Sequence, residues 1–112
     1  LWFRETLVNQ YQKRQPVFVI GHHPLFIDHP EEKEEYFNIP PLKRQNLFKL
    51  FLENNVVAYL SGHTHKRVIN NYKNIQLVSG ETTSKNFDKR PFGFRLWHVS
   101  ADTINHHFIA LQ

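Results

Sequence analysis

The chain has 112 residues, 40% of them hydrophobic, and a formal net charge of +4. A chain of this length folds as one domain at most, so residues 1–112 are predicted to form a single unit. It contains no cysteine, which excludes a disulfide framework, a thiol nucleophile and a cysteine-ligated zinc site. No apolar run is long enough to cross a bilayer, so we expect a soluble chain without a membrane partner.

Basic residues are scattered along the chain, and histidine is unusually frequent. The 14 lysines and arginines form only short groups, such as Lys66 and Arg67. A nucleic-acid-binding surface needs a concentrated basic stripe, so the composition disfavours nucleic acid as a partner. The eight histidines indicate a metal-binding role instead, because neutral imidazole is the commonest protein ligand for transition metals.

The first segment is predicted to be a helix. Residues 1–8 are amphipathic at helical spacing, and Lys13 and Arg14 lie where a helix C-terminus favours cations, before Pro16 ends the helix. No capping residue precedes this helix, and the chain begins with Leu1. We therefore interpret the sequence as the C-terminal part of a longer protein.

Two apolar runs are predicted to be buried strands, and each leads directly into histidines. Val17–Ile20 precedes residues 21–24 (Gly-His-His-Pro), and Val56–Leu60 precedes residues 61–65 (Ser-Gly-His-Thr-His). Open α/β sheets bind ligands beyond the carboxyl ends of their strands. The pattern therefore predicts that both histidine clusters lie on one rim of a sheet.

A charged loop and a helix are predicted between these strands. Residues 28–39 indicate a long exposed loop with a helical turn, either a solvated linker or a lid over the rim. Pro40 and Pro41 favour a helix that runs to Asn54. Its apolar side is expected to hold Leu42, Leu47, Leu50 and Phe51, and its outer side Lys43, Arg44 and Lys49. The order strand, helix, strand implies two parallel strands with a crossover.

The remainder is predicted to be antiparallel β structure. Residues 67–72 and 75–79 indicate a hairpin with its turn at Lys73 and Asn74, and residues 80–91 a polar loop. A second hairpin is expected from residues 94–99 and 103–111.

Histidines at the two strand ends permit a metal site. Residues i and i+2 of a strand point the same way, so His63 and His65 are expected to face one cavity, with His22 or His23 opposite. Two cations about 3.5–4 Å apart would suit phosphoester chemistry. Three histidines alone cannot hold two divalent ions, and no spacing marks the acidic loop residues as ligands. These residues are Asp28, Glu81, Asp88 and Asp102.

Together, residues 21–24 and 62–65 resemble the last two motifs of the calcineurin-like metallophosphoesterases. Within that superfamily the chain is most similar to the CPPED-like group, judging from Pro24-Leu25-Phe26, Tyr36-Phe37-Asn38 and residues 91–95. The resemblance covers the whole chain. It implies an α/β fold, the C-terminal half of a four-layer α/β/β/α sandwich in which a parallel strand-helix-strand unit is followed by antiparallel hairpins.

The resemblance also implies a function and a set of site residues. The full protein would be a metal-dependent phosphoester hydrolase in which hydroxide attacks a phosphorylated substrate, assisted by two divalent or trivalent ions of manganese, zinc or iron. His22 and His63 would bind one ion, and His65 the other. His23 occupies the intervening position, which is not a metal ligand in the family; either it contacts the substrate phosphate as a catalytic residue or it has no role in the site. Apart from the resemblance, Lys66 and Arg67 lie beside the site in sequence and are expected either to add positive potential for substrate binding or to be exposed charges at the start of a strand.

The family's earlier motifs are absent from this sequence. They supply a bridging aspartate, an asparagine ligand and a further histidine, so the chain would carry only the histidine half of the site. We therefore expect the isolated chain to be inactive. We also expect it to self-associate through apolar sheet surface that neighbouring strands would otherwise cover.

Other interpretations of the histidines are also open. One is a non-catalytic module that binds protein or nucleic acid and uses its histidines structurally; another is a complete mononuclear hydrolase with three histidine ligands. His29 is expected in solvent. His98, His106 and His107 are expected to be structural, the last two on opposite faces of a strand. The expected aromatic core consists of Phe18, Phe48, Phe51, Tyr59 and Trp97.

Overall fold

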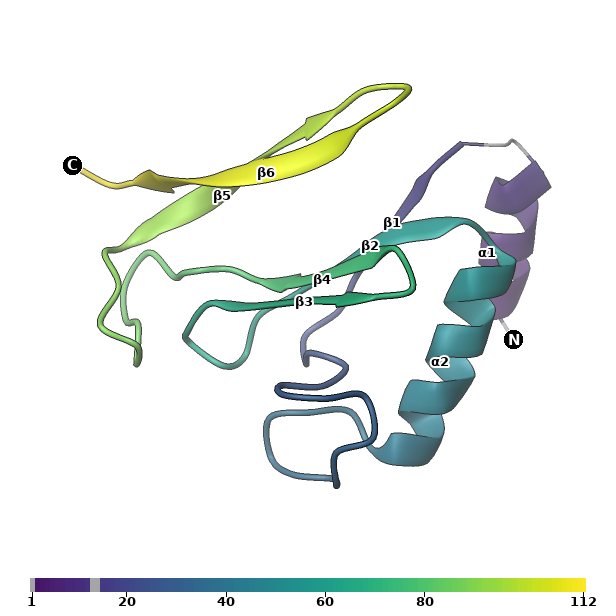
Figure 1. Cartoon of the computed structure of the whole chain (residues 1–112), viewed down its shortest axis with the longest axis horizontal. Coiled ribbons are helices and arrows are strands. Elements are labelled where there is room, and N and C mark those ends of the chain that lie inside the picture. The colour runs from purple at the N-terminus through teal and green to yellow at the C-terminus, as the bar shows by residue number, and fades with distance from the viewer. Residues whose placement is uncertain (1, 13–14) are drawn as a thin grey trace.

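The computed structural model describes residues 2–12 and 15–112, so the cations predicted for the first helix end, Lys13 and Arg14, lie outside the described residues. Two helices and six strands follow one another as Figure 1 shows. They are α1 (Trp2–Gln12), β1 (Val17–Ile20), α2 (Pro41–Glu53), β2 (Val56–Ser61), β3 (Val68–Tyr72), β4 (Ile75–Ser79), β5 (Gly93–Val99) and β6 (Ile104–Ala110). In the described part of the chain, neither helix has the length and apolar character to span a membrane.

Four strands form a mixed sheet in the order β1-β2-β4-β3. The crossover through α2 makes β1 and β2 parallel, as predicted. The hairpin of β3 and β4 also forms as predicted, with left-handed backbone at Lys73 and Asn74 in its turn. Sequence alone did not indicate that β4 then pairs in parallel with β2. Because β1, β2 and β4 run the same way, the loops that follow them leave from one edge of the sheet.

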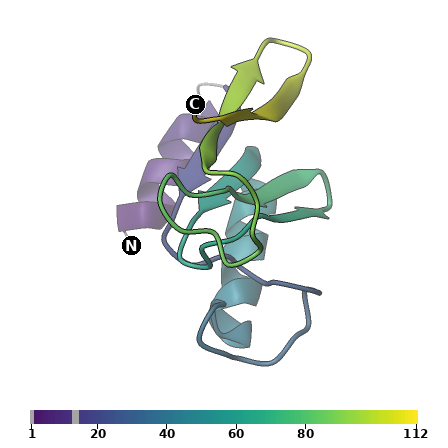
Figure 2. The same cartoon turned by 90° about the vertical axis from the view of Figure 1, so that its left-hand side faces the viewer.

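The sheet lies between the helices and the second hairpin. Buried residues of both helices, Leu7, Phe48 and Phe51, pack in one cluster with Tyr59 and Leu77 of the sheet. On the other face, Phe18 of β1 meets Trp97 of β5 edge to face, with ring centroids 5.4 Å apart. The views in Figures 1 and 2 agree that the β5–β6 hairpin lies over this second face. The fold is therefore α/β, with a mixed four-stranded sheet that is parallel over β1, β2 and β4, and a separate antiparallel hairpin of β5 and β6.

The helix α2 differs from its prediction in two residues. Lys43 and Lys49 are exposed, but Arg44 is fully buried. Leu42, expected on the apolar side, is 73% exposed. The buried stripe of α2 is Arg44, Phe48 and Phe51, spaced by four and three residues, and Leu42 lies two positions from that stripe and thus on the opposite side.

The strand β1 is less buried than predicted. Its last residue, Ile20, is 78% exposed, whereas the matching part of β2 is buried or half-buried. The reason is the position of β1 at the edge of the sheet, where one side lacks a neighbouring strand.

Candidate metal-binding site

The loops after β1 and β2 are joined by backbone hydrogen bonds that continue the sheet ladder. The Gly21 amide donates to the Leu60 carbonyl at 2.9 Å, and the Gly62 amide donates to the His22 carbonyl at 3.0 Å. The Tyr59 hydroxyl also donates to the His23 carbonyl at 2.8 Å. A side chain at Gly21 would overlap the Tyr59 hydroxyl, so only glycine allows this bond. The two histidine loops are therefore held side by side.

Three imidazoles meet on this rim. The Nε2 atom of His22 lies 3.0 Å from Nδ1 of His63. The His23 ring lies beside both, with centroids 5.0 Å from His22 and 4.0 Å from His63. Burial lowers the pKa of His23, and positive charge on His63 and His22 would lower it further. The predicted meeting of the two strand-end clusters is thus observed for His22, His23 and His63.

A backbone carbonyl fixes the tautomer of His63. Its Nε2 atom lies 3.2 Å from the Tyr36 carbonyl oxygen, which can only accept, so Nε2 carries the proton. Nδ1 therefore presents a lone pair toward His22. Metal-binding histidines commonly donate their second ring nitrogen to a carbonyl in this way.

His63 and His65 do not lie on a continued strand, so the argument from i and i+2 alternation was wrong. The strand β2 ends at Ser61, and both histidines adopt left-handed backbone conformations with φ of 67° and 52°. Between them Thr64 is buried, and its hydroxyl donates to the Lys66 carbonyl at 3.0 Å. This tight turn places the two imidazoles in different surroundings.

His65 lies against the loop that follows β4. Its ring is nearly parallel to that of Phe87, with centroids 5.4 Å apart, and its Nδ1 atom lies 3.3 Å from the Lys85 carbonyl. Nδ1 is therefore the donor, which leaves the Nε2 lone pair free. No group of three or more histidine, aspartate or glutamate side chains placed to hold one ion occurs among residues 2–12 and 15–112. His65 is separate from the pair of His22 and His63.

The donor atoms of the pair fit a transition-metal ion. Two nitrogens bound to one zinc ion at about 2.0–2.1 Å lie about 3.0–3.4 Å apart, depending on the angle between the two bonds. The measured separation of the His22 and His63 nitrogens is 3.0 Å. His63 is already in the tautomer that ligation needs. His22 Nε2, the donor of the present contact, would lose its proton, and both rings would turn so that their lone pairs meet at an ion off the line joining the two nitrogens.

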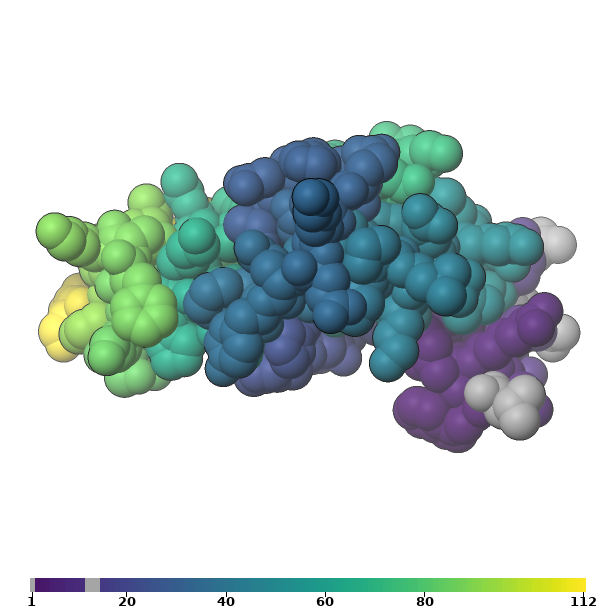
Figure 3. Space-filling model, turned by 90° about the horizontal axis from the view of Figure 1, so that it is seen from below, coloured from purple at the N-terminus to yellow at the C-terminus, as the bar shows by residue number. Residues whose placement is uncertain are grey.

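The loop predicted over residues 28–39 is neither helical nor a freely solvated linker. The Glu32 carboxylate accepts the amide protons of Ile27 and Asp28 and the side-chain amide of Asn38. These hydrogen bonds lower the pKa of Glu32 against the opposing effect of burial. The loop crosses the centre of the face seen in Figure 3 and carries Tyr36 and Phe37 to the ring of His63. It thus forms one wall of the site.

The Arg44 guanidinium forms hydrogen bonds with three backbone carbonyls of this loop. Its Nη1 donates to the carbonyls of Pro30 and Glu32 at 2.7 and 2.8 Å. Its Nε and Nη2 both donate to the Ile39 carbonyl, at 3.2 and 2.8 Å. One buried side chain therefore satisfies three loop carbonyls on either side of Tyr36.

The loop after β4 is stabilised by ion pairs of a buried glutamate. The Glu81 side chain is fully buried and binds Arg95 through both carboxylate oxygens, at 2.9 and 3.0 Å, and the Arg90 Nε at 3.1 Å. Asp88 accepts the backbone amides of Arg67 and Arg90, which lowers its pKa. Both acidic residues therefore have structural partners and position the loop that contacts His65.

Lys66 and Arg67, predicted to bind substrate, follow the histidine turn directly. Lys66 is half-buried and Arg67 is exposed. Neither side chain forms an ion pair with another residue in the described ranges. Both charges are thus available near the rim.

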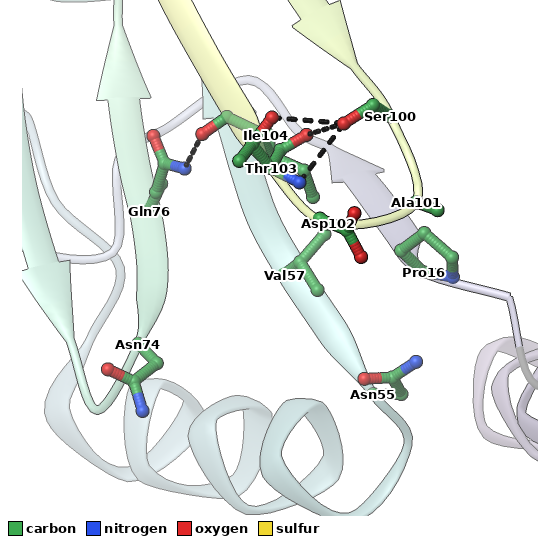
Figure 4. Close-up of a pocket in the computed structure, with 10 residues that line it drawn as sticks. All are labelled: Pro16, Asn55, Val57, Asn74, Gln76, Ser100, Ala101, Asp102, Thr103 and Ile104. Atoms are coloured by element: carbon green, nitrogen blue, oxygen red, sulfur yellow. Dashed lines mark hydrogen bonds between the residues drawn. The ribbon is translucent and has the colours of Figure 1, made fainter.

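A cavity of about 440 Å³ lies at the opposite edge of the sheet. Figure 4 shows it between the starts of β2 and β4 and the turn of the β5–β6 hairpin. Polar groups from Asn55, Asn74 and Asp102 line it, and the Gln76 amide beside them donates to the Ile104 carbonyl at 2.9 Å. None of the candidate histidines lines this cavity, so it is separate from the proposed chemistry.

Protonation of His106 is expected to weaken the fold. Its Nδ1 accepts the Arg95 Nε proton at 2.8 Å, and burial, reinforced by the Arg95 charge, lowers its pKa from the ordinary value of about 6.5. The unfolded chain then binds a proton more readily, so the free energy of unfolding should be retained above pH 6.5 and fall progressively below it. Urea denaturation at pH 7.5 and pH 5.5 measures this change. His106→Gln should reduce the pH dependence of the free energy of unfolding, whereas His107→Gln, at an exposed histidine, should leave it unchanged. If both substitutions change it equally, His106 is not the group responsible.

The rim geometry agrees with a comparison to known protein families. The model of the calcineurin-like phosphoesterase family matches residues 1–67, which include both histidine clusters. The chain belongs to the calcineurin-like phosphoesterase family. The predicted resemblance is thereby confirmed.

This calcineurin-like phosphoesterase chain is also similar to curated relatives of the predicted CPPED-like group. It is 30% identical to the serine/threonine-protein phosphatase CPPED1 of Rattus norvegicus over 112 residues and to that of Homo sapiens over 113 residues. Each alignment covers 99% of this chain and 36% of the relative. The chain therefore spans about a third of the length of these proteins. No solved structure matches it significantly.

Sequence reasoning missed several residues that shape the site of this phosphoesterase chain. Arg44 was assigned to the outer side of its helix, although its spacing from Phe48 and Phe51 places it on the buried stripe. Glu81 lies two residues beyond Ser79, the last residue of β4, and its position on the rim could be foreseen only with the pairing of β4 and β2. The carbonyls of Tyr36 and Lys85 leave no sequence signal, because any residue type supplies one.

Proposed function

We propose that this chain supplies the histidine side of a metal-dependent phosphoester hydrolase site. The observation that carries the proposal is the 3.0 Å approach of His22 Nε2 to His63 Nδ1, with the His63 tautomer set by the Tyr36 carbonyl. Membership of the calcineurin-like phosphoesterase family and the names of the CPPED1 relatives support the same reaction class. The substrate would be a phosphorylated molecule.

Each site residue has a distinct role in this proposal. His22 and His63 bind one ion, and His65 binds a second through Nε2, as its Nδ1 contact with Lys85 allows. Manganese, zinc or iron ions at these positions would acidify water and neutralise negative charge on the phosphoryl oxygens. A dinuclear centre would also need oxygen ligands, which bridge hard cations better than imidazole does.

The remaining rim residues act on the substrate. His23 remains largely neutral because its pKa is lowered, so it can donate one hydrogen bond to a phosphoryl oxygen. Lys66 and Arg67 add positive potential beside the turn. The Tyr36 side chain is 74% exposed and its ring lies 4.8 Å from that of His63. It would contact the part of the substrate that extends from the phosphate.

The proposal extends to the fold of the whole protein. Helices, sheet and hairpin form three successive layers here, and a fourth layer over the hairpin would complete an α/β/β/α sandwich. Phe94 and Leu96 on the outer side of β5 are each more than 40% exposed, and Ile20 lies open on the edge strand. These apolar surfaces would also explain self-association of the chain alone.

The alternative, a protein- or nucleic-acid-binding module with structural histidines, is less well supported. The family match and the names of the CPPED1 relatives favour a hydrolase over such a module. A mononuclear site with three histidines is also disfavoured, since His65 is separate from the other two.

Hydrolysis of a chromogenic aryl phosphate in manganese buffer tests this function, and the assay uses the full protein of which this chain is proposed to be a part, because the chain alone is expected to be inactive. His63→Asn removes the proposed ligand while keeping a residue that tolerates left-handed backbone. We expect it to lower kcat/KM by more than the roughly 10–100-fold loss typical of residues that only orient metal ligands. His29→Asn, at an exposed histidine outside the rim, should leave activity unchanged. Full activity of His63→Asn would refute the proposed role.

A further inference from the structure

The outer face of the β5–β6 hairpin is apolar at one end and polar at the other. Phe94, Leu96 and Ile109 lie toward the base of the hairpin. Near the turn, the exposed residues are His98, Asn105 and His107. Leu96 lies directly opposite His107, so the apolar end and the polar end adjoin on this face.

His98 and His107 lie on neighbouring strands and point toward each other. In the strand register His98 is opposite Asn105, and His107 is opposite Leu96, so the two histidines are diagonal neighbours on one face. The Nε2 atom of His98 lies 3.3 Å from Nδ1 of His107, and their ring planes are inclined by only 13°. One nitrogen donates a proton and the other accepts it, so the lone pair of one ring is directed at the other ring.

This spacing matches two ligands of one ion. Nitrogens bound to a tetrahedral zinc ion at about 2.0–2.1 Å lie about 3.3–3.4 Å apart. An ion about 2.0–2.1 Å from both nitrogens would lie to one side of the line that joins them, so each ring would turn by roughly 35–40° from the hydrogen-bonded arrangement to bind it. Neither imidazole forms another hydrogen bond with the described part of the chain.

The neighbouring histidine, His106, provides a contrast. It lies on the inner face of the hairpin, accepts the Arg95 Nε proton, and its ring lies against that of Trp97 with centroids 4.3 Å apart. The Nδ1 atom of His106 therefore already accepts a hydrogen bond within the fold. The outer face, by comparison, has no lysine or arginine that would repel a cation.

We infer that His98 and His107 form a second transition-metal site, separate from the rim, that binds a zinc-type ion across the two strands of the hairpin. Imidazole pairs favour zinc, nickel or copper over manganese, magnesium or calcium. Asn105 and water can complete the coordination. Because the ion binds only the paired strands, it stabilises the hairpin in the folded chain.

Calorimetric titration with zinc alone tests the inference, using protein that carries His63→Asn and His65→Asn as the reference so that neither proposed rim ion is bound. We expect one zinc ion per chain in this reference. Adding His107→Asn should weaken zinc binding by about 10²-fold, since the second ligand no longer acts at high effective concentration. Adding His29→Asn, which removes an exposed histidine elsewhere, should have no effect. Equal affinity of the reference and the His107→Asn protein, or no zinc binding by the reference, would overturn the inference.

Paramagnetic broadening by bound copper gives an independent measurement of where the site lies. Cu²⁺ is paramagnetic, so in the same reference protein, which lacks the rim ligands His63 and His65, binding at the hairpin should broaden the backbone amide signals of residues 96–99 and 105–108 while those of β3 stay sharp. Broadening spread elsewhere in the chain, or none, would refute the site. Neither measurement depends on hydrolysis, so failure here leaves the proposed function standing, and loss of activity in His63→Asn says nothing against the hairpin site.

Discussion

Replacing Arg44 with alanine is expected to lower the free energy of unfolding by about 3 kcal/mol or more. The buried guanidinium donates to the carbonyls of Pro30, Glu32 and Ile39, and its removal leaves these acceptors unsatisfied around a cavity. Domains of this size are stable by only about 5–15 kcal/mol, so the loss is a large share. Urea denaturation followed by tryptophan fluorescence measures it.

Two further variants test whether the loss of stability is specific to the Arg44 guanidinium. Lys43→Ala, at the exposed neighbour on the same helix, should change the free energy of unfolding by less than about 0.5 kcal/mol. Arg44→Lys should recover only part of the loss, because an ammonium group cannot reproduce the fork of donors. Because the loop carries Tyr36, Arg44→Ala should also accelerate amide exchange over residues 30–39. A stable Arg44→Ala protein with unchanged exchange would refute the role given to this side chain.

The second large effect is expected for Glu81→Gln, which should cost about 3–5 kcal/mol. The substitution keeps the size of the side chain but removes the charge that compensates Arg95 and Arg90. The Arg95 side chain is only 11% exposed, so its unpaired charge cannot be well solvated. Denaturant unfolding at pH 7.5 measures the loss.

Glu53→Gln, at an exposed glutamate, is the matched control and should be nearly neutral. The Glu81 variant should also loosen residues 82–90 and with them the contacts of His65 with Phe87 and Lys85. Hydrogen exchange reports this directly. If Glu81→Gln is as stable as the control, the ion pairs contribute little and another interaction holds the loop.

Local sequence patterns were sufficient to predict most elements of this fold. The run Val56–Leu60 is almost continuously apolar and forms β2, and the turn at Lys73 and Asn74 forms the hairpin of β3 and β4. The crossover from β1 to β2 follows from a helix between two apolar runs. These features depend on residues close in sequence, which is why pattern alone identifies them.

The features that pattern could not supply depend on contacts between distant segments. The burial of Arg44 follows from its spacing to Phe48 and Phe51, but its partners, the carbonyls of the preceding loop, become known only with the fold. The position of His65 depends on Phe87 and Lys85, which lie in a loop without secondary structure. At the site, the meeting of His22 and His63 followed from the parallel strand ends, whereas the separation of His65 followed from a left-handed turn that the sequence did not indicate.

The chemistry proposed for this chain depends on His22 and His63 binding one metal ion on the rim. X-ray absorption at the zinc edge tests this in protein carrying His65→Asn, His98→Asn and His107→Asn, so that neither the third rim histidine nor the hairpin contributes a signal. We expect imidazole nitrogens at about 2.0–2.1 Å from zinc, and loss of this shell when His22→Asn and His63→Asn are added. A nitrogen shell that persists unchanged without these two histidines, or protein that retains no zinc with both present, would contradict it.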